Sequence, residues 1–154
     1  MDASDSPRVI AFPPLIFGGF ALVGAASHLI HPIDLAPHFA LRVAGAILAV
    51  VAPSTALAAR SAMVRSGTNI NPSLPALAVA RSGPYRFTRN PMYLSLCLLN
   101  LGIGLLLCDA VPILLTLGLF WVLHVGVILR EERYMEAKFG EAYTSYKAGV
   151  RRWL

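Results

Sequence analysis

Charged residues are scarce in this sequence. They make up 14% of its 154 residues, whereas an average soluble domain carries about 25%. Hydrophobic residues reach 56%, so few polar side chains remain to cover a surface in water. The composition therefore excludes an ordinary soluble domain and predicts an integral membrane protein. The length suits one compact unit, so we expect residues 1–154 to form a single domain.

Cysteines and metal-ligand clusters are also sparse. Cys97 and Cys108 are too few for a disulfide framework, and on one helix they would lie roughly 16 Å apart, too far for a bridge. His28, His31 and His38 could bind a metal, but no Cys or Glu accompanies them, so we predict no metal site.

We also expect no cleavable leader, because the N-terminal residues lack the basic region, short apolar core and cleavage site of a signal peptide. We therefore expect the first apolar run to stay as a membrane anchor. The net charge is +5 and, apart from Arg8 and Arg42, the basic residues lie at 60–89 and 130–152. Basic residues next to apolar runs are typical of a protein that orients itself in a membrane. We expect contact with membrane lipids and not with nucleic acid.

Long apolar runs are what the sequence does have. About 20 residues are needed to cross the hydrocarbon core of a bilayer. The apolar runs that approach or reach this length are 11–30, 38–60, 92–107 and 110–129. They predict an all-α integral membrane protein with about four transmembrane helices. Only a short turn separates the last two runs, so these should pack as an antiparallel hairpin.

Two further segments complete the predicted fold. Prolines and glycines argue against a continuous helix in 61–90, where we expect a re-entrant or interfacial loop. After residue 130, apolar residues recur at helical spacing from Met135 to Tyr146, which predicts a C-terminal amphipathic helix.

The charge pattern predicts an orientation for this fold. With four spans, both termini and the 61–90 loop share one side, and that side holds every Lys and Arg except Arg42. The positive-inside rule makes this side cytosolic. We therefore expect a multi-pass protein of the inner (cytoplasmic) membrane, with both termini and the active site in the cytosol.

Polar residues inside the apolar runs could mark a site. His124 shares a helical face with Glu131, and Asn100 shares one with Tyr93, at a spacing of seven residues. Polar groups in the bilayer often face a functional site. Such residues can also do no more than form hydrogen bonds between helices. The sequence pattern leaves both alternatives open.

Two polar clusters stand where apolar runs begin or end. The stretch 81–93 (RSGPYRFTRNPMY) precedes the third run, and Glu131 and Glu132 directly follow the fourth. Lys and Arg are more usual than acids at a membrane interface. The two acids could begin a solvated helix and pair with Arg130 and Arg133, or they could face a ligand.

These clusters match a known family in order and spacing. The match lies in Gly83-Pro84-Tyr85, in Arg89-Asn90-Pro91-Met92-Tyr93, and in Glu131-Glu132 with Phe139-Gly140, Tyr143, Tyr146 and Val150. They resemble the isoprenylcysteine carboxyl methyltransferase and phospholipid methyltransferase family, in its bacterial-type branch. Its members are small membrane enzymes that use S-adenosylmethionine. The resemblance covers roughly 60–154. It implies that 61–154 hold the cofactor-binding loop, the helical hairpin and the C-terminal helix, whereas 1–60 form two N-terminal spans.

The resemblance implies a set of cofactor-binding residues in the loop, the start of the third helix and the paired acids. These are Leu77, Ala78, Val79, Ala80, Tyr85, Asn90, Pro91, Met92, Tyr93, Glu131 and Glu132. Two positions depart from the isoprenylcysteine enzymes. Asn90 stands in place of a His, and Val127 stands in place of an Arg that those enzymes direct toward the substrate.

The chemistry of the cofactor fits the same residues. S-adenosylmethionine needs carboxylates for its ammonium, a donor for its carboxylate, and aromatic faces for its sulfonium and adenine. The chain can supply each group. Glu131 or Glu132 could bind the ammonium, Arg89 or Arg86 could bind the carboxylate, and Tyr85 or Tyr93 could offer the aromatic face. Methyl transfer is an in-line displacement that positioning and charge can promote without a metal. His124 could titrate near neutrality as a base, so the candidate catalytic residues are Arg89, Glu132 and His124.

We therefore expect an S-adenosylmethionine-dependent methyltransferase that releases S-adenosylhomocysteine. Its acceptor would be a lipophilic small molecule or lipid from the bilayer, with a carboxylate as one candidate. One alternative is a sterol-reductase-like enzyme that uses NADPH, because such enzymes carry a similar Arg-His-Pro-x-Tyr element. Another is a non-catalytic subunit of a membrane complex. The Asn-Pro-Met sequence and the paired acids favour the methyltransferase, and the oligomeric state is left open.

Overall fold

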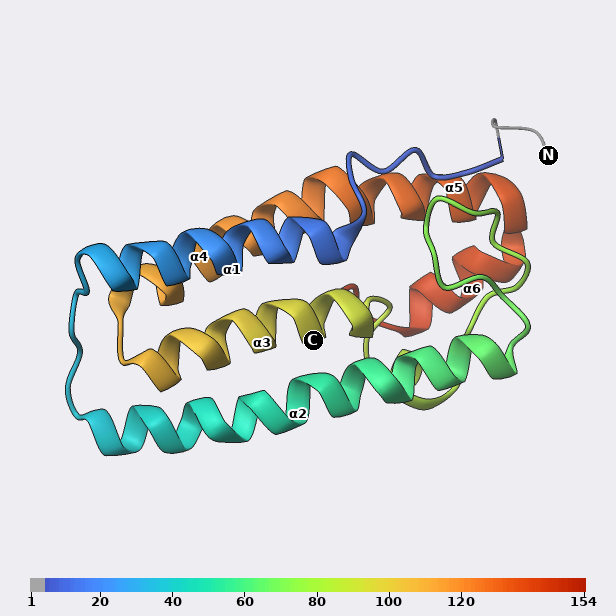
Figure 1. Ribbon diagram of the computed structural model, residues 1–154. Helices are drawn as coiled ribbons and strands as arrows, with labels where there is room; N and C mark the ends of the chain where they lie inside the picture. The colour runs from blue at the N-terminus through green and yellow to red at the C-terminus, as the bar shows by residue number, and fades with distance from the viewer. Residues whose placement is uncertain (1–4) are drawn as a thin grey trace. The chain divides into compact units, whose positions relative to one another are not determined.

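We describe residues 5–154 from a computed structural model in which the regular elements are helices (Figure 1). In chain order they are α1 (Pro13–Ile30), α2 (His38–Arg65), the 3₁₀ helix η1 (Gly83–Arg86), α3 (Pro91–Leu107), α4 (Ala110–Leu123), the π-helix η2 (His124–Ile128), α5 (Leu129–Phe139) and α6 (Glu141–Gly149). Residues 5–154 contain no β-strand, and their extended pairing is limited to isolated bridges. The predicted all-α fold is confirmed.

Three helical segments are long and apolar enough to cross a membrane. These are α1, α2 and the continuous helix Ala110–Phe139, which joins α4, η2 and α5. The apolar helix α3 has 17 residues and is shorter than these. The prediction of a helical membrane protein is confirmed, whereas the number of four spans stays a prediction. The first three predicted runs agree with α1, α2 and α3 within a few residues, except that α2 continues past residue 60 to Arg65. The fourth run, 110–129, agrees with its helix at the start only, because that helix continues to Phe139.

Contacts between residues divide the chain into two units. We call residues 5–12, 55–92 and 124–154 the polar unit, and residues 13–54 and 93–123 the apolar unit. All Lys and Arg residues except Arg42 belong to the polar unit. The helix α2 contributes to both units, and the prediction of a single domain stays open.

Glycines bring the helices of the apolar unit together. The helix α1 packs against α4, where Gly24 lies against Pro112. A Cβ added at Gly45 of α2 would lie 2.8 Å from the backbone oxygen of Gly102 in α3, and Ala49 also lies against Gly102. Small residues therefore let the α2 and α3 backbones approach closely.

A buried amide joins the last two helices of the apolar unit. The side-chain nitrogen of Asn100 in α3 lies 3.2 Å from the Pro112 carbonyl oxygen and 3.0 Å from the Thr116 hydroxyl, both in α4. Asn100 is buried, so these bonds satisfy an amide that would otherwise be costly to bury. The predicted hairpin is confirmed, and for Asn100 the interhelical hydrogen bond is the correct alternative.

Two histidines of the apolar unit, His28 and His38, pair with carboxylates. His28 Nδ1 lies 2.8 Å from Asp109 Oδ2, and His38 Nε2 lies 3.0 Å from Asp34 Oδ2. In the part of the chain that the structure describes, no group of three His, Cys, Asp or Glu residues could hold a metal ion.

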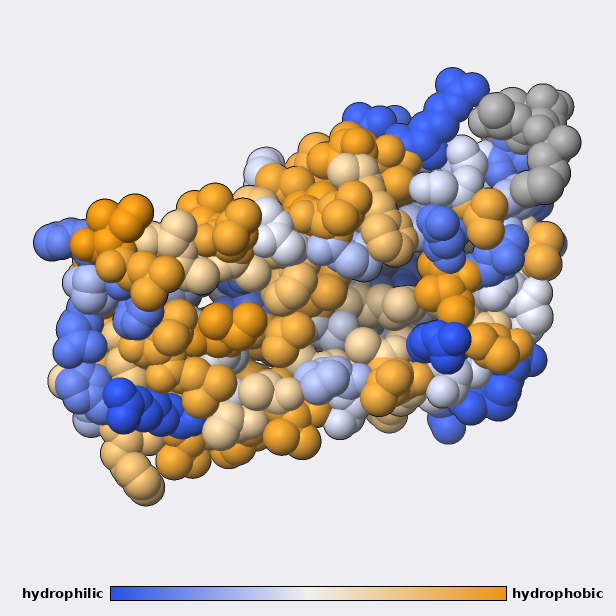
Figure 2. Space-filling model, in the orientation of Figure 1, coloured by the Kyte–Doolittle hydropathy of each residue, from blue (hydrophilic) through white to orange (hydrophobic). Residues whose placement is uncertain are grey.

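The helices carry large exposed hydrophobic side chains. Examples along α1, α2 and α4 are Leu15, Leu22, Leu29, Phe39, Ile47, Val50, Leu114 and Leu117. Figure 2 shows apolar surface of this kind on the face in view. Such extensive apolar surface suits contact with lipid chains and not with water.

The prediction of one continuous C-terminal helix is wrong. Gly140 adopts a φ of +52°, in the left-handed region that favours glycine. The helix α5 therefore ends at Phe139, and α6 folds back beside it (Figure 1). This return buries Tyr143 and Tyr146, and residues 150–154 continue without a helix.

The close contact at Gly45 gives a stability prediction. A methyl group at Gly45→Ala would meet backbone atoms of α3, and such overpacking costs about 1–3 kcal/mol. Alanine gains about 1 kcal/mol of helix propensity over glycine, so the net change should be destabilising. Gly18→Ala is the matched control, because no atom outside α1 lies within 4 Å of its added Cβ. Thermal unfolding in detergent should give a lower midpoint for Gly45→Ala than for Gly18→Ala, and the reverse order would contradict the packing.

Candidate active site

The loop that carries the first motif is anchored by a buried tyrosine. The 3₁₀ helix η1 begins at Gly83, whose φ of +59° suits glycine. Tyr85 is buried in a cluster with Ala59 and Ala62 of α2 and with Ala80. This cluster fixes the loop against the C-terminal part of α2.

The segment that leads into this loop is held by hydrogen bonds. The backbone N–H of Leu77 donates to the Thr68 hydroxyl over 3.0 Å, and that of Ala76 donates to the Tyr134 hydroxyl of α5 over 3.1 Å. These bonds hold the backbone where residues Leu77 to Ala80 begin. Leu77 is exposed and Ala80 is buried.

The chain end lies along the second motif. The Arg89 N–H donates to the Arg151 carbonyl oxygen over 2.9 Å. The Asn90 side-chain amide and the Thr88 hydroxyl donate to the Arg152 carbonyl oxygen over 2.9 and 3.1 Å. The C-terminal residues are thus part of the site. Sequence reasoning gave Arg152 no role, because pairing between such distant segments leaves no periodic signal.

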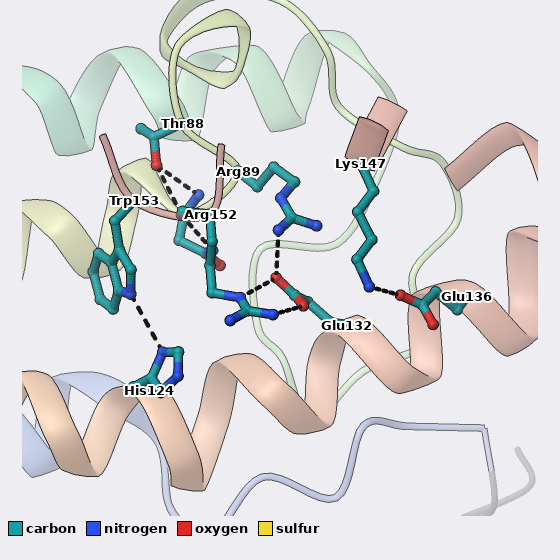
Figure 3. A network of polar contacts seen from close by, with 9 residues as sticks. Thr88, Arg89, His124, Glu132, Glu136, Lys147, Arg152 and Trp153 are labelled. Atoms are coloured by element: carbon teal, nitrogen blue, oxygen red, sulfur yellow. Dashed lines mark hydrogen bonds and ion pairs between the residues drawn. The ribbon is translucent and has the colours of Figure 1, made fainter. Parts of the chain in front are cut away.

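Three charged side chains meet in the polar unit (Figure 3). The Glu132 carboxylate accepts hydrogen bonds from Arg152 Nε over 2.9 Å and from Arg152 Nη2 over 2.8 Å. Arg89 Nη2 lies 3.1 Å from Glu132 Oε1, and the side chains of Arg89 and Glu132 are 7% and 6% exposed. Two positive charges therefore surround one buried carboxylate.

The alternative in which Glu132 pairs with neighbouring arginines is wrong. Arg130 donates to the Arg8 carbonyl oxygen and Arg133 to that of Leu129. The partners of Glu132 are instead Arg89 of the 61–90 loop and Arg152 of the chain end.

A π-helix changes the register of the paired acids. The predicted stripe from His124 to Glu131 assumed α-helical spacing, but η2 has more residues per turn than an α-helix. Glu132 is the buried acid, whereas Glu131 is half-buried. The turn also leaves the Gly126 carbonyl oxygen free to accept the Ile10 N–H over 3.2 Å.

His124 has a partner that sets its tautomer. Trp153 Nε1 lies 3.3 Å from His124 Nδ1 (Figure 3). An indole N–H can only donate, so Nδ1 accepts and the neutral ring carries its proton on Nε2. The role of His124 as a base stays a prediction, and it would require Nδ1 to exchange its Trp153 bond for a proton.

Three buried tyrosines surround the charged residues. Burial raises the pKa of Tyr85 and Tyr143 well above the usual 10.0. Burial also raises the pKa of Tyr146 to about 12, although the charges of Arg89 and Arg81 lower it in part. These hydroxyls stay protonated near neutral pH, so they can donate hydrogen bonds but cannot act as bases.

Most of the predicted site residues belong to the polar unit. After burial, the Glu131 charge is the largest cause of the raised pKa of Tyr85, so these two side chains interact. Met92 packs against the cluster around Tyr85, and the buried Pro91 begins α3. Tyr93 belongs to the apolar unit, so its predicted contact with the cofactor stays a prediction.

The fold and this cluster define a helical membrane protein with a buried charged site. Comparison with protein families identifies the family to which this membrane protein belongs. The model of the phospholipid methyltransferase family matches residues 41–142, and the chain belongs to this family. The predicted family is confirmed, and the chain is a membrane methyltransferase.

The chain is also similar to an uncharacterized protein of Haemophilus influenzae. The two are 44% identical over 63 residues, which cover 41% of this chain and 100% of that protein.

The buried tyrosines give a second stability prediction. The Tyr146 hydroxyl donates to the Tyr85 carbonyl oxygen over 2.7 Å in a buried place. Tyr146→Phe leaves that oxygen without its donor, which costs about 1–3 kcal/mol. The exposed Thr144→Ala on the same helix should change stability by less than about 0.5 kcal/mol. Chemical unfolding in detergent measures both, and equal stabilities would contradict the fastening of η1 to α6.

Proposed function

We propose that the polar unit binds S-adenosylmethionine and transfers its methyl group to a lipophilic acceptor. The observation that carries the proposal is the buried guanidinium of Arg89. Its Nη2 pairs with Glu132, whereas its buried Nε and Nη1 form no hydrogen bond with any group of residues 5–154. Buried donors left unsatisfied cost free energy, so a ligand carboxylate at this position would stabilise the site.

The other residues supply the groups that the rest of the cofactor needs. Glu131 is the acid for the ammonium, because both oxygens of Glu132 are already engaged by arginines. Tyr85, Tyr143 and Tyr146 supply aromatic faces, and Tyr85 and Tyr143 supply hydroxyl donors. When bound, S-adenosylmethionine supplies an activated methyl carbon, and the protein has to orient it and exclude water.

The charge pattern supports a position of this unit at the cytosolic surface. The helices α2 and Ala110–Phe139 have 28 and 30 residues, more than the roughly 20 that cross the hydrocarbon core. Their additional turns, 55–65 and α5, belong to the polar unit together with all Lys and Arg residues except Arg42. We propose a multi-pass inner-membrane protein whose cofactor enters from the cytosol.

The acceptor comes from the bilayer in this proposal. The exposed apolar helices contact lipid, so a lipid or lipophilic small molecule can approach between them. Val127 is fully buried and apolar where the isoprenylcysteine enzymes have an arginine. A carboxylate acceptor would therefore need another cation in place of that arginine.

Ligand binding tests this proposal. S-adenosylhomocysteine should raise the unfolding temperature of the purified full-length protein in detergent, and the shift should grow with ligand concentration because binding stabilises the native state. NADPH should give no shift. A response to NADPH alone would favour the sterol-reductase-like alternative, and no response to either in folded protein would favour a non-catalytic subunit.

A matched pair of acids locates the binding. Glu131→Gln removes the proposed ammonium partner and should weaken S-adenosylhomocysteine binding roughly tenfold or more. Glu141→Gln removes an exposed acid of α6 and should leave binding unchanged. Equal affinities in a calorimetric titration would place the ammonium elsewhere.

A further inference from the structure

The chain end contacts several residues of the proposed site. Carbonyl oxygens of Arg151 and Arg152 accept the backbone N–H of Arg89 and the side-chain amide of Asn90. An isolated parallel bridge also pairs Thr88 with Arg151. No pattern in the sequence predicts a function for these C-terminal residues, although they lie against the family motif.

The side chain of Arg152 acts on Arg89 through Glu132. Arg152 donates two hydrogen bonds to the Glu132 carboxylate, whereas Arg89 contacts it as an ion pair through Nη2 alone. This sharing leaves the three side chains with one positive charge in excess, and it leaves two nitrogens of Arg89 for another acceptor. Arg152 therefore determines how much of the Arg89 guanidinium a ligand can use.

The side chain of Trp153 acts on His124. Its indole N–H occupies Nδ1, so His124 holds its proton on Nε2 and can donate a hydrogen bond there. Without this bond the neutral ring could adopt either tautomer. Neighbouring residues of the chain end therefore determine how much of the Arg89 guanidinium is left for a ligand and which tautomer His124 adopts.

We propose that Arg152 and Trp153 are positioning residues of the methyl-transfer site. Arg152 acts through Glu132 to present Arg89 to an anionic ligand group, and Trp153 acts through His124 to hold it as an Nε2–H donor. The part that concerns Arg152 rests on the proposed function, whereas the part that concerns Trp153 can be tested without any ligand.

Nitrogen NMR of ¹⁵N-histidine-labelled protein tests the role of Trp153. Trp153→Phe keeps an aromatic ring at this position and removes the indole N–H together with the five-membered part of the ring system. The neutral His124 signals, assigned with His124→Gln, should show the Nε2–H tautomer in the wild type and a shift toward a tautomer mixture in Trp153→Phe. An unchanged His124 pattern in folded Trp153→Phe, or an Nδ1–H tautomer in the wild type, would overturn this role.

Calorimetric titration with S-adenosylhomocysteine tests the role of Arg152. Arg152→Gln should weaken binding roughly ten- to hundredfold. Arg152→Lys should recover part of the loss, because lysine keeps a positive charge that can pair with Glu132. Arg151→Gln is the matched control, with an exposed side chain on the same segment. Should Arg152→Gln not fold, the affinities of Arg152→Lys and Arg151→Gln still test the role of Arg152. Arg152→Lys should bind more weakly, because a lysine cannot reproduce the forked contact of an arginine with the carboxylate.

The outcomes separate the two proposals. Affinities of Arg152→Gln and Arg152→Lys equal to that of Arg151→Gln would overturn the positioning role of Arg152. A wild-type protein that does not bind S-adenosylhomocysteine would overturn the proposed function itself. The NMR result for Trp153 stands independently of both.

Discussion

One buried carboxylate holds the polar unit together. The Glu132 side chain is 6% exposed and pairs with two arginines, Arg89 of the 61–90 loop and Arg152 of the chain end. Removal of one partner from a fully buried ion pair costs about 3–5 kcal/mol, because the other charge is left uncompensated. Arg152 is 34% exposed, so its own contribution is below that range. The position of Arg89, and with it the proposed ligand site, depends on this arrangement.

The two units divide the physical tasks of the protein. The apolar unit packs through glycines and the buried Asn100, and it exposes large hydrophobic side chains that suit lipid. The polar unit carries nearly all the charge, and its buried tyrosines surround arginines and acids. A methyltransferase with a charged cofactor and a lipophilic acceptor needs both environments in one chain. Membership of the phospholipid methyltransferase family agrees with this division.

Much of the fold follows from the sequence, because apolar runs and turn residues are local signals. The starts of α2 and α4 and the turn at Cys108-Asp109 agree with the prediction. The break at Gly140 was missed, because the apolar spacing continues across it. The π-helix at His124–Ile128 was also missed, and it decides that Glu132 is the buried acid. The contacts of Arg152 and Trp153 join residues far apart in the chain, and no pattern in a single sequence encodes them.

The central claim is that the polar unit holds S-adenosylmethionine. Ultraviolet crosslinking of methyl-tritiated S-adenosylmethionine to the purified protein, followed by peptide mapping, tests it most directly. Label is expected in peptides from 77–92 and 124–153, and excess unlabelled S-adenosylhomocysteine should remove it. Label confined to 13–54, or label that excess S-adenosylhomocysteine does not displace, would contradict it.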